Sequence, residues 1–287
     1  MGDRNLGIIV VHHKTPTMLE ECLERIARFV PESKICVVDT APDKTFVDEL
    51  CNRFANVEII ETANHSLANA VNVGLLRHHT PFVVHMNADV YVEAETFDHL
   101  MRPFVDPAVA MTGPIFLTGE GVRQQHGPFY EPNFWGLSAA GQRAVSWLSG
   151  ALQVIRKSAI QVVGGMDTSL RFYNEDVEWC YRLRQSGYKC LLIPTRVTHI
   201  GGSSTPDAPR FLVEGYRGAM QVSRRYRPPW FRVLHSLIVK MEANVRKRTA
   251  RQEQQRKAYS DIADMFRKKT FNESPFGRTL DDSKIIE

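Results

Sequence analysis

The first sixty residues alternate between short apolar, β-branched runs and segments with helical periodicity. Residues 6–11, 33–38 and 57–60 are three such runs, which predict buried strands. Between the first two, apolar residues recur at helical spacing from Met18 to Ile26. Strands that alternate with helices in this order are typical of a parallel sheet with crossover helices. The sequence therefore predicts an α/β fold with a mostly parallel sheet.

The stretch from Phe82 to Val90 predicts a further strand, and its end is polar. It begins with apolar residues and closes on Asn87-Ala88-Asp89. Ligands of open α/β sheets bind at the carboxyl ends of strands, and side chains two residues apart in extended backbone point to the same side. A carboxylate there can hold a divalent cation that in turn binds a diphosphate. The alternative is a plain strand end followed by an Asx turn.

Two more segments in the first half of the chain carry polar residues at the end of a predicted strand or at the start of a predicted helix. Asp39 closes a predicted strand, where a nucleotide can lie, although turn or helix capping is an equal alternative. Residues 64–74 combine small residues and asparagines at a predicted helix start, where free N–H groups can meet an anion. A plain capped helix is the alternative for this segment.

In the second half, Asn174 can cap a helix that opens with Glu175 and Asp176. Acids in a first turn also balance the helix dipole, so these two need no further role. Residues 188–193 predict a strand closed by Pro194, and His199 follows beside a Gly-Gly-Ser-Ser loop. A lone histidine is more often structural than a ligand.

Composition limits the class of protein. The 287 residues suffice for one large domain or a domain with an appendage, and a 43% hydrophobic share is ordinary for a globular chain. No apolar run reaches the ~18 residues that a membrane span needs, and the N-terminus leads into a strand without a signal-peptide pattern. The five cysteines are scattered without metal spacing, which predicts reduced thiols and a cytoplasmic location.

The formal charge of +4 is unevenly distributed. Residues 1–223 carry 20 Lys+Arg against 24 Asp+Glu, whereas residues 224–257 carry 11 against two, a net +9. After Pro206 the pattern predicts helices over 211–226 and 230–245, the second with an apolar stripe, and then a polar, basic stretch over 246–257. The segment 224–257 is expected to meet a membrane surface, nucleic acid or only solvent.

As a set, these pieces resemble the family 2 glycosyltransferases with a GT-A fold, and in particular the rhamnosyltransferase-like branch that builds bacterial surface polysaccharides. The resemblance covers roughly residues 6–205. It rests on the strand end at Asp39, on residues 64–74 with Ser66 and Leu67 replacing a glycine and an aromatic, and on Asn87-Ala88-Asp89. Further matches are Gly164 to Asp167 with Met166 for a phenylalanine, the pair Glu175-Asp176, and His199 to Ser204.

The resemblance implies an α/β GT-A domain over residues 1–205 with helices on both faces of its sheet, and a helical, basic extension over 206–287. It implies an inverting, metal-dependent glycosyltransferase that moves a sugar from a nucleotide diphosphate donor, such as dTDP-rhamnose or a UDP-sugar, to a hydroxyl of a glycan or lipid-linked acceptor. The alternatives are a transferase acting on nucleic acid and a non-catalytic nucleotide-sugar-binding module. The expected location is cytoplasmic, with peripheral contact at the inner membrane face.

The same resemblance assigns roles to single residues. Asp176 is the expected general base, with Glu175 as the alternative. Asp89 and His199 are expected to hold Mg²⁺ or Mn²⁺, and because position 87 is an asparagine, only Asp89 of that motif is an anion. The residues expected to bind the donor are Asp39, Asn64, Ala68, Asn72, Asn87 and Asp89.

Overall fold

The computed structural model describes residues 6–124, 143–201 and 208–277. The chain forms two compact units. The first comprises Met1–Met166 and Asp176–Ser204, and the second comprises Asp167–Glu175 and Thr205–Glu287. The division predicted from the sequence, 1–205 and 206–287, assigned the short segment Asp167–Glu175 to the first domain. It belongs to the second unit because arginines of that unit hold it, as described below.

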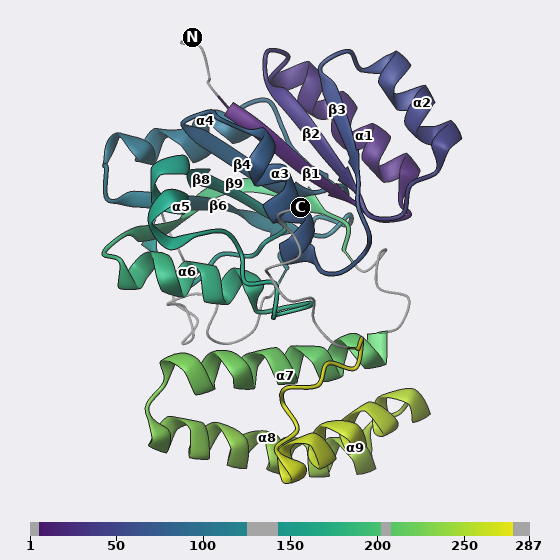
Figure 1. Cartoon of the computed structure of the whole chain (residues 1–287), viewed down its shortest axis with the longest axis vertical. Helices are drawn as coiled ribbons and strands as arrows, with labels where there is room; N and C mark the ends of the chain where they lie inside the picture. Colours follow the sequence, from purple (N-terminus) through teal and green to yellow (C-terminus); the bar gives the residue numbers. More distant parts are fainter. Residues whose placement is uncertain (1–5, 125–142, 202–207, 278–287) are drawn as a thin grey trace. The chain divides into compact units, whose positions relative to one another are not determined.

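A mixed sheet forms the centre of the first unit. Its strands are β1 (Leu6–His12), β2 (Lys34–Asp39), β3 (Val57–Glu61), β4 (Phe82–Asn87), β5 (Val90–Tyr91), β6 (Val109–Leu117), β7 (Arg143–Ala144), β8 (Leu152–Arg156) and β9 (Lys189–His199). They lie in the order β3-β2-β1-β4-β8-β6-β9-β5, and β7 pairs with β9 (Figure 1). Strands β1 to β4 run parallel, while β8 is antiparallel to β4 and β6. The predicted α/β class is confirmed.

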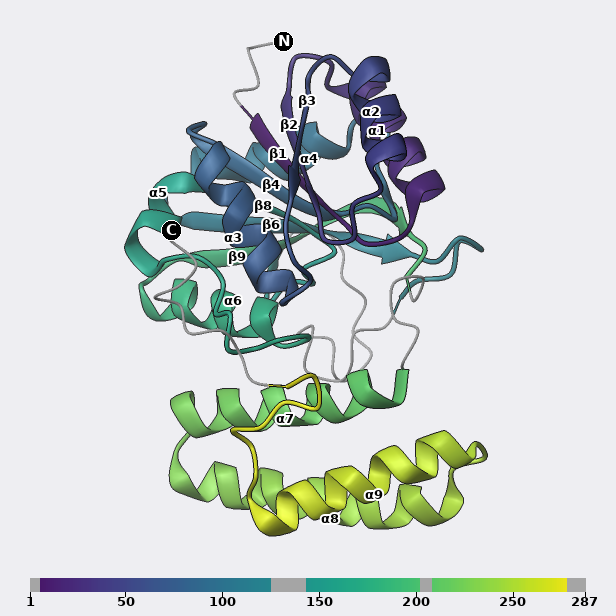
Figure 2. The ribbon, with the colours of Figure 1, turned by 45° about the vertical axis from the view of Figure 1, so that its right-hand side comes forward.

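Helices cover both faces of this sheet. They are α1 (Pro16–Phe29), α2 (Lys44–Arg53), α3 (Leu67–Arg77), α4 (Thr96–Met101) with the 3₁₀ turn η1 (Arg102–Val105), α5 (Lys157–Val163) and α6 (Glu175–Gln185). Figure 2 shows α1 and α2 on one side of the strands and α3, α5 and α6 on the other. Because side chains alternate along a strand, Ile8 and Val10 enter the apolar layer of α1, whereas Ile9 between them enters that of α3.

The last long strand differs from its prediction. We expected a strand closed by Pro194, but β9 continues through this proline to His199. The parallel register between β6 and β9 shifts between Gly113 and Ile115, which face Leu192 and Arg196 across the proline. A strand tolerates proline at such an irregularity because the missing N–H is not needed in the ladder there. His199 therefore ends a strand rather than lying in a loop.

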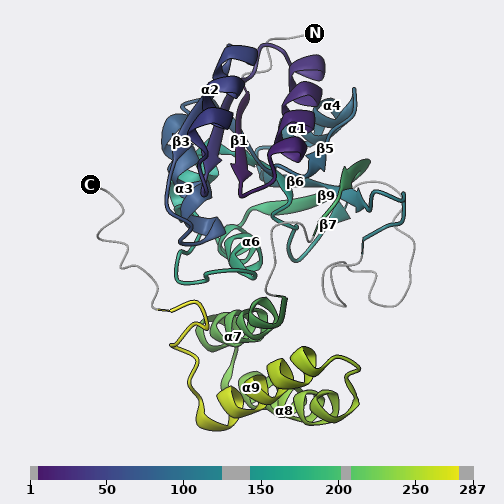
Figure 3. The same cartoon turned by 90° about the vertical axis from the view of Figure 1, so that its right-hand side faces the viewer.

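The second unit contains three long helices, α7 (Ala208–Tyr226), α8 (Pro229–Thr249) and α9 (Glu253–Lys268), which Figure 3 shows nearly end-on. The sequence predicted the first two, but it described 246–257 as a polar, basic stretch and assigned no element to residues 258–268, which form most of α9. The buried core of this unit consists of Met220, Val239, Ala243, Ile262, Met265, Phe266 and Phe271. Ala258, Ile262, Met265 and Phe266 of α9 are buried at helical spacing, so the sequence carries a periodic signal for this helix that the prediction missed.

A buried arginine ties the segment Asp167–Glu175 to α7. Arg217 is 1% exposed, forms an ion pair with Glu214, and donates hydrogen bonds to the backbone oxygens of Ser169 and Phe271, both at 3.1 Å. Arg225, which lies about two helical turns further along α7, forms an ion pair with Asp167. Buried charges need such partners, so these contacts fix the segment within the second unit.

Candidate active site

The carboxyl ends of three parallel strands meet at one edge of the sheet. The register pairs His12 of β1 with Asp39 of β2, and Val11 of β1 with Asn87 of β4. Asp89 lies just past the end of β4 and directly before Val90 of β5. The predicted strand-end residues are thus brought to a single edge of the first unit, where open α/β sheets bind their ligands.

Asp39 is almost fully buried at this edge and has a histidine partner. Its Oδ1 lies 3.1 Å from Nδ1 of His12 and accepts a 2.9 Å hydrogen bond from the N–H of Ala41. The N–H of Thr15 donates to Nε2 of His12, so the ring proton lies on Nδ1 and faces Asp39. Burial alone would raise the pKa of Asp39, but the His12 contact and the Ala41 N–H outweigh it and lower this pKa. His12 was not predicted from the sequence, because it lies 27 residues before Asp39 and only the pairing of β1 with β2 brings the two together.

Asp89 and His199 come together because β5 pairs with β9. The antiparallel register sets Val90 opposite His199, which brings Oδ1 of Asp89 to 3.5 Å from Nε2 of His199. The N–H of Gly201 donates to Oδ2 of Asp89 at 3.0 Å. Burial acts to raise the pKa of Asp89, but His199 and this N–H outweigh it, so the pKa is lowered. Asp89 is therefore a buried, ionised carboxylate at neutral pH.

Gln124 determines which nitrogen of His199 carries the proton. Its side-chain Nε2 donates to the backbone oxygen of His199 at 2.5 Å, so its Oε1 is the atom that faces Nδ1 of His199, at 2.9 Å. An amide oxygen only accepts, and Nδ1 must therefore be protonated. In the neutral ring the bare nitrogen is Nε2, which faces the Asp89 carboxylate. Two electron-rich atoms in opposition are unfavourable unless a cation or a proton lies between them.

This donor set fits a divalent cation. It offers one carboxylate oxygen and one imidazole nitrogen, and the other ring nitrogen is held by an acceptor, as is usual for metal-binding histidines. Within the described residues, no group of three or more His, Cys, Asp or Glu side chains could hold a metal. A cation held by this pair would have coordination positions left for phosphate oxygens and water. The sequence predicted Asp89 and His199 but not Gln124, which falls in a Gly- and Gln-rich stretch without periodicity.

The second carboxylate of interest, Asp176, reaches the same edge from α6. Its Oδ2 accepts a 2.9 Å hydrogen bond from the N–H of Gly150, and its Oδ1 accepts one from Val177 at 2.8 Å. The next residue, Ala151, accepts from the N–H of Asn87 at 3.0 Å, so the loop before β8 joins Asp176 to the end of β4. Asp176 is half-buried but closely surrounded by protein, and this burial raises its pKa to about 6.

A buried histidine lies behind the Gly150 loop. A Cβ added to Gly150 would lie 3.5 Å from Cβ of Asp176 and 3.8 Å from Cε1 of His85. His85 is fully buried on β4, and burial lowers its pKa to about 3. The ring is thus neutral at neutral pH and supplies no positive charge to Asp176.

Glu175, the alternative base, is 3% exposed, so Asp176 is the more accessible acid of the pair. The expected N-cap differs from the structure. Tyr173 and Asn174 both have left-handed backbone, with φ of 67° and 69°, rather than the extended backbone of an N-cap. The side-chain Nδ2 of Asn174 instead donates to the backbone oxygen of Gly215 at 3.0 Å. Two consecutive non-glycine residues in this region are strained, a feature that clusters at functional sites.

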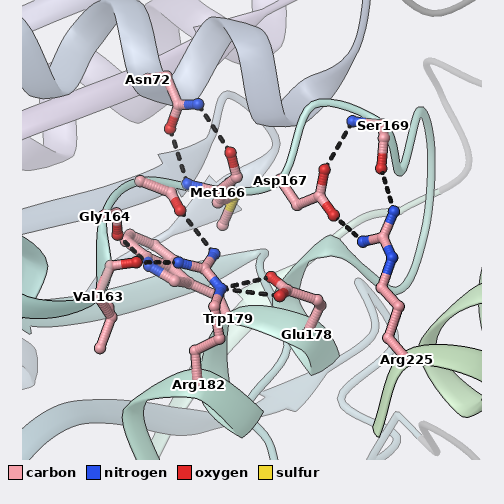
Figure 4. Close-up of polar contacts among 11 residues, drawn as sticks. Asn72, Val163, Gly164, Met166, Asp167, Ser169, Glu178, Trp179, Arg182 and Arg225 are labelled. Atoms are coloured by element: carbon pink, nitrogen blue, oxygen red, sulfur yellow. Dashed lines mark hydrogen bonds and ion pairs between the residues drawn. The ribbon is translucent and has the colours of Figure 1, made fainter. Parts of the chain in front are cut away.

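The predicted donor-binding residues of segment 64–74 have different environments. Asn64 is exposed in the loop before α3, and Ala68 is buried in its first turn. The Ser66 hydroxyl caps α3 by accepting from the N–H of Asn69 at 3.0 Å. Asn72 makes a reciprocal pair with the backbone of Met166, with both hydrogen bonds at 2.8 Å (Figure 4). The Asn72 amide therefore has a structural role in tying α3 to the segment after α5.

That segment is also held from α6, as Figure 4 shows. Arg182 donates to the backbone oxygens of Val163 and Gly165, and its Nε contacts the Glu178 carboxylate at 2.8 Å. Gly165 has no room for a side chain, because a Cβ there would lie 2.3 Å from Oδ1 of Asn72. Gly165 of the Gly-Gly pair is thus required for close packing against Asn72.

Comparison with protein families gives a match over more than half of the chain. The sequence model described as "Glycosyl transferase family 2" matches residues 7–164. A pre-mycofactocin glycosyltransferase of Mycobacterium tuberculosis is 28% identical over 187 residues, which cover 57% of this chain and 39% of the relative. An N-acetylglucosaminyl-diphospho-decaprenol L-rhamnosyltransferase of the same species is 33% identical over 103 residues, a third of each protein. The chain thus spans well under half the length of these curated relatives.

Solved structures with the same fold are distant in sequence. GalNAc-T7 with UDP, GalNAc and Mn²⁺ gives a TM-score of 0.62 at 16% identity, covering 96% of this chain and 56% of that one. A mannosyltransferase of Pyrobaculum calidifontis with GDP-Man and Mn²⁺ gives 0.58 at 15% identity, covering 93% and 83%. TarS of S. aureus with UDP-GlcNAc gives 0.60 at 14% identity, covering 91% and 80%. At such identities the likeness shows the fold alone, which is the predicted GT-A fold.

Proposed function

The chain belongs to glycosyl transferase family 2, and from this membership we propose that it is an inverting, metal-dependent glycosyltransferase with a nucleotide diphosphate-sugar donor. The observation that carries the proposal is the pair Asp89 and His199 at the sheet edge, with the tautomer of His199 set by Gln124. Asp39 is a second buried carboxylate at this edge and is suited to bind the nucleoside part of the donor, with Asn64, Ala68, Asn72 and Asn87 as further donor-binding candidates.

The metal that fits this donor set best is Mn²⁺. Mg²⁺ prefers oxygen ligands only, whereas an imidazole suits a transition metal. Solved structures of the same fold with Mn²⁺ bound support the choice. When bound, the ion would neutralise the charge that develops on the diphosphate leaving group. Asp89 remains ionised for this role because its lowered pKa lies far below neutral pH.

Asp176 is suited to act as the general base. In a single displacement, an acceptor hydroxyl forms a bond to the anomeric carbon as the bond to the diphosphate oxygen breaks, and the hydroxyl proton passes to Asp176. Attack from the face opposite the leaving group inverts the anomeric centre. A pKa raised to about 6 gives the carboxylate more proton affinity than an ordinary aspartate, while leaving it ionised at neutral pH.

The acceptor we propose is a glycan or a lipid-linked glycan. A relative whose name joins L-rhamnosyl transfer to N-acetylglucosaminyl-diphospho-decaprenol supports this class, and with it dTDP-rhamnose as one donor to test beside UDP-sugars. Met166 and Leu67, which replace aromatic residues of the motifs, are expected to affect the choice of sugar.

A thermal-shift screen tests the donor site. The chain is heated with UDP-, GDP- and dTDP-sugars, each with and without Mn²⁺, because a ligand that binds the native state raises Tm. We expect one nucleotide to raise Tm only with Mn²⁺, and product analysis by NMR to show an inverted anomeric centre. A retained configuration, or an equal shift without metal that survives Asp89→Ala, would contradict the proposal.

A further inference from the structure

Helix α8 leaves an apolar face uncovered. Seven large apolar side chains on it are between 46% and 69% exposed, and they recur at spacings of three and four residues: Trp230, Val233, Leu234, Leu237, Ile238, Met241 and Val245. We refer to these seven residues as the α8 face. On the opposite side of the helix, Val239 and Ala243 are buried in the core of the second unit.

The α8 face differs from the scattered apolar residues that are usual on a protein surface. Single exposed apolar residues are common on soluble proteins, but a contiguous stripe along one helix marks a surface that is covered by something else. The helix is attached to its neighbours through its other side, so the α8 face contributes nothing to the core of the unit. Within the described ranges, no helix is long and apolar enough to cross a bilayer, so a contact through this face lies along a surface.

Positive charge surrounds a hollow beside the face. A cavity of about 560 Å³ opens between α7, α8 and the turn after α9, and Val233 and Leu237 of the α8 face line it. Among its described lining residues there is no carboxylate, but there are four cations: Arg224, Arg232, Lys240 and Lys269. The backbone oxygen of Arg224 accepts from Arg232 at 3.4 Å, and the Arg224 guanidinium lies over the Phe271 ring. Arg224 and Arg232 are thus held in place beside the cavity.

The charge of residues 224–257 indicates which kind of partner covers the α8 face. Residues 224–257 carry 11 Lys+Arg against two Glu. A second copy of the chain would bring two such positive surfaces together, which is repulsive. Duplex nucleic acid would pair with the cations, but its phosphate backbone offers no apolar surface against which seven apolar side chains could be buried. An anionic bilayer offers hydrocarbon for the stripe and phosphate for the cations at the same depth.

We propose that the α8 face is a membrane-docking surface, which lies flat on a bilayer that contains anionic phospholipids. Lys240 and the other cations around the cavity then contact lipid phosphates, while Trp230 and Leu237 enter the acyl region. This inference uses only the second unit and does not depend on the donor site. It implies that the glycosyl acceptor is presented at a membrane surface.

Vesicle flotation of the full chain tests the proposal. We expect it to float with vesicles of phosphatidylcholine and phosphatidylglycerol but not with phosphatidylcholine alone, and less at high salt. Each cation removed, as in Lys240→Gln, should weaken vesicle partition by about 5-fold. Leu237→Ser with Met241→Ser should abolish flotation. The matched control is Val105→Ser in η1, because Val105 is 90% exposed and lies in the first unit.

The fluorescence of Trp230 gives a second readout, which is measured on the natural chain. Anionic vesicles should shift its emission to the blue, acyl-chain bromine should quench it, and Trp230→Phe should remove the response. Equal binding to neutral and anionic vesicles, no vesicle binding, a dimer that Leu237→Ser dissociates, or duplex DNA binding without vesicle binding would each overturn the proposal. Since the donor screen is done without lipid, its failure is distinct from any of these results.

Discussion

Two aspartates of the first unit lie in similarly enclosed places, yet their pKa values move in opposite directions. Burial acts to raise both, and both accept backbone N–H groups, from Gly201 in one case and from Gly150 in the other. Asp89 also faces the imidazole of His199, and its pKa is lowered, whereas the pKa of Asp176 rises to about 6. The groups that contact each carboxylate, not burial, therefore separate the two.

The difference suits the two carboxylates to different roles. A carboxylate that binds a metal must stay ionised, while a general base must accept a proton and works best with a pKa near the working pH. His85 lies behind the Gly150 loop that contacts Asp176, but its buried ring is neutral, so it does not supply a positive charge to this carboxylate. The predictions below test this division of roles.

Removing the proton acceptor should have the largest effect. Asp176→Asn is expected to lower turnover by roughly 10²–10⁴-fold, the usual scale for a general base. Donor affinity in the presence of Mn²⁺ should change little, because Asp176 is not one of the two metal ligands that we propose. Steady-state kinetics and calorimetry measure the two effects separately.

Glu175→Gln is the control for this variant, because it removes a neighbouring carboxylate that is 3% exposed. We expect it to keep most of the turnover if it folds, as checked by circular dichroism. An active Asp176→Asn beside a folded, inactive Glu175→Gln would reverse the two roles.

Removing the metal carboxylate should act on binding rather than on proton transfer. Asp89→Ala is expected to abolish Mn²⁺-dependent nucleotide binding, a loss of roughly 100-fold or more, given that even residues behind metal ligands contribute 10–100-fold. Calorimetry with the nucleotide found in the donor screen measures it. Unchanged affinity in the presence of Mn²⁺ would show that Asp89 holds no metal.

Gln124→Leu should weaken Mn²⁺ binding by roughly 10–100-fold, because the acceptor that keeps the proton on Nδ1 of His199 is lost. Nitrogen-15 NMR of the ring should show the tautomer change directly, which a merely structural loss would not produce. Gln124→Glu keeps an acceptor at this position and should retain the tautomer. If both variants bind Mn²⁺ as the natural chain does, Gln124 does not position His199.

The smallest effect concerns stability as a function of pH. Since the folded-state pKa of Asp176 is raised from 3.8 to about 6, the folded state binds the proton more tightly than the unfolded state. This group's contribution to stability is therefore largest below pH 3.8 and is lost as pH rises through about 6. On the order of 1 kcal/mol, after allowance for screening, should vanish over this range and be missing in Asp176→Asn.

Asp89 should show the opposite trend, because its pKa is lowered. Its contribution is present above the unfolded value of 3.8 and is lost as pH falls below it. Urea unfolding of both Asn variants between pH 3 and 8 compares them. If the free energy of unfolding of the two variants changed with pH in the same way, the pKa values of Asp89 and Asp176 would not be shifted in opposite directions.

The features that could be predicted from the sequence are those that depend on residues close together in the chain. Strand β4 and the strand end at Asp39 follow from apolar runs that stop at polar residues, and the sheet class follows from their alternation with helices. The strand through Pro194 was not predictable, because a register shift against β6 compensates for the proline. Asn174 is not the expected N-cap, because its side-chain amide instead donates to the backbone oxygen of Gly215 in α7.

The side chains that contact the site residues were also harder to predict, because they lie far away in the sequence. His12 and Asp39 are 27 residues apart, and Gln124 and His199 are 75 apart, so only the register of the sheet brings each pair together. The sequence identified Asp89, His199 and Asp176 through a resemblance of motifs, which says nothing about their pKa values. The opposed shifts arise from tertiary contacts, among them the loop at Gly150 and the turn at Gly201.

The most direct test of the central claim is a carboxyl titration by NMR. The chain is labelled with carbon-13 at its aspartate carboxyl carbons, and the two resonances are assigned with Asp89→Asn and Asp176→Asn. We predict that Asp176 titrates at about 6 and that Asp89 titrates below the ordinary value of 3.8. Titration of both near 3.8, or of Asp89 as the group near 6, would contradict the account.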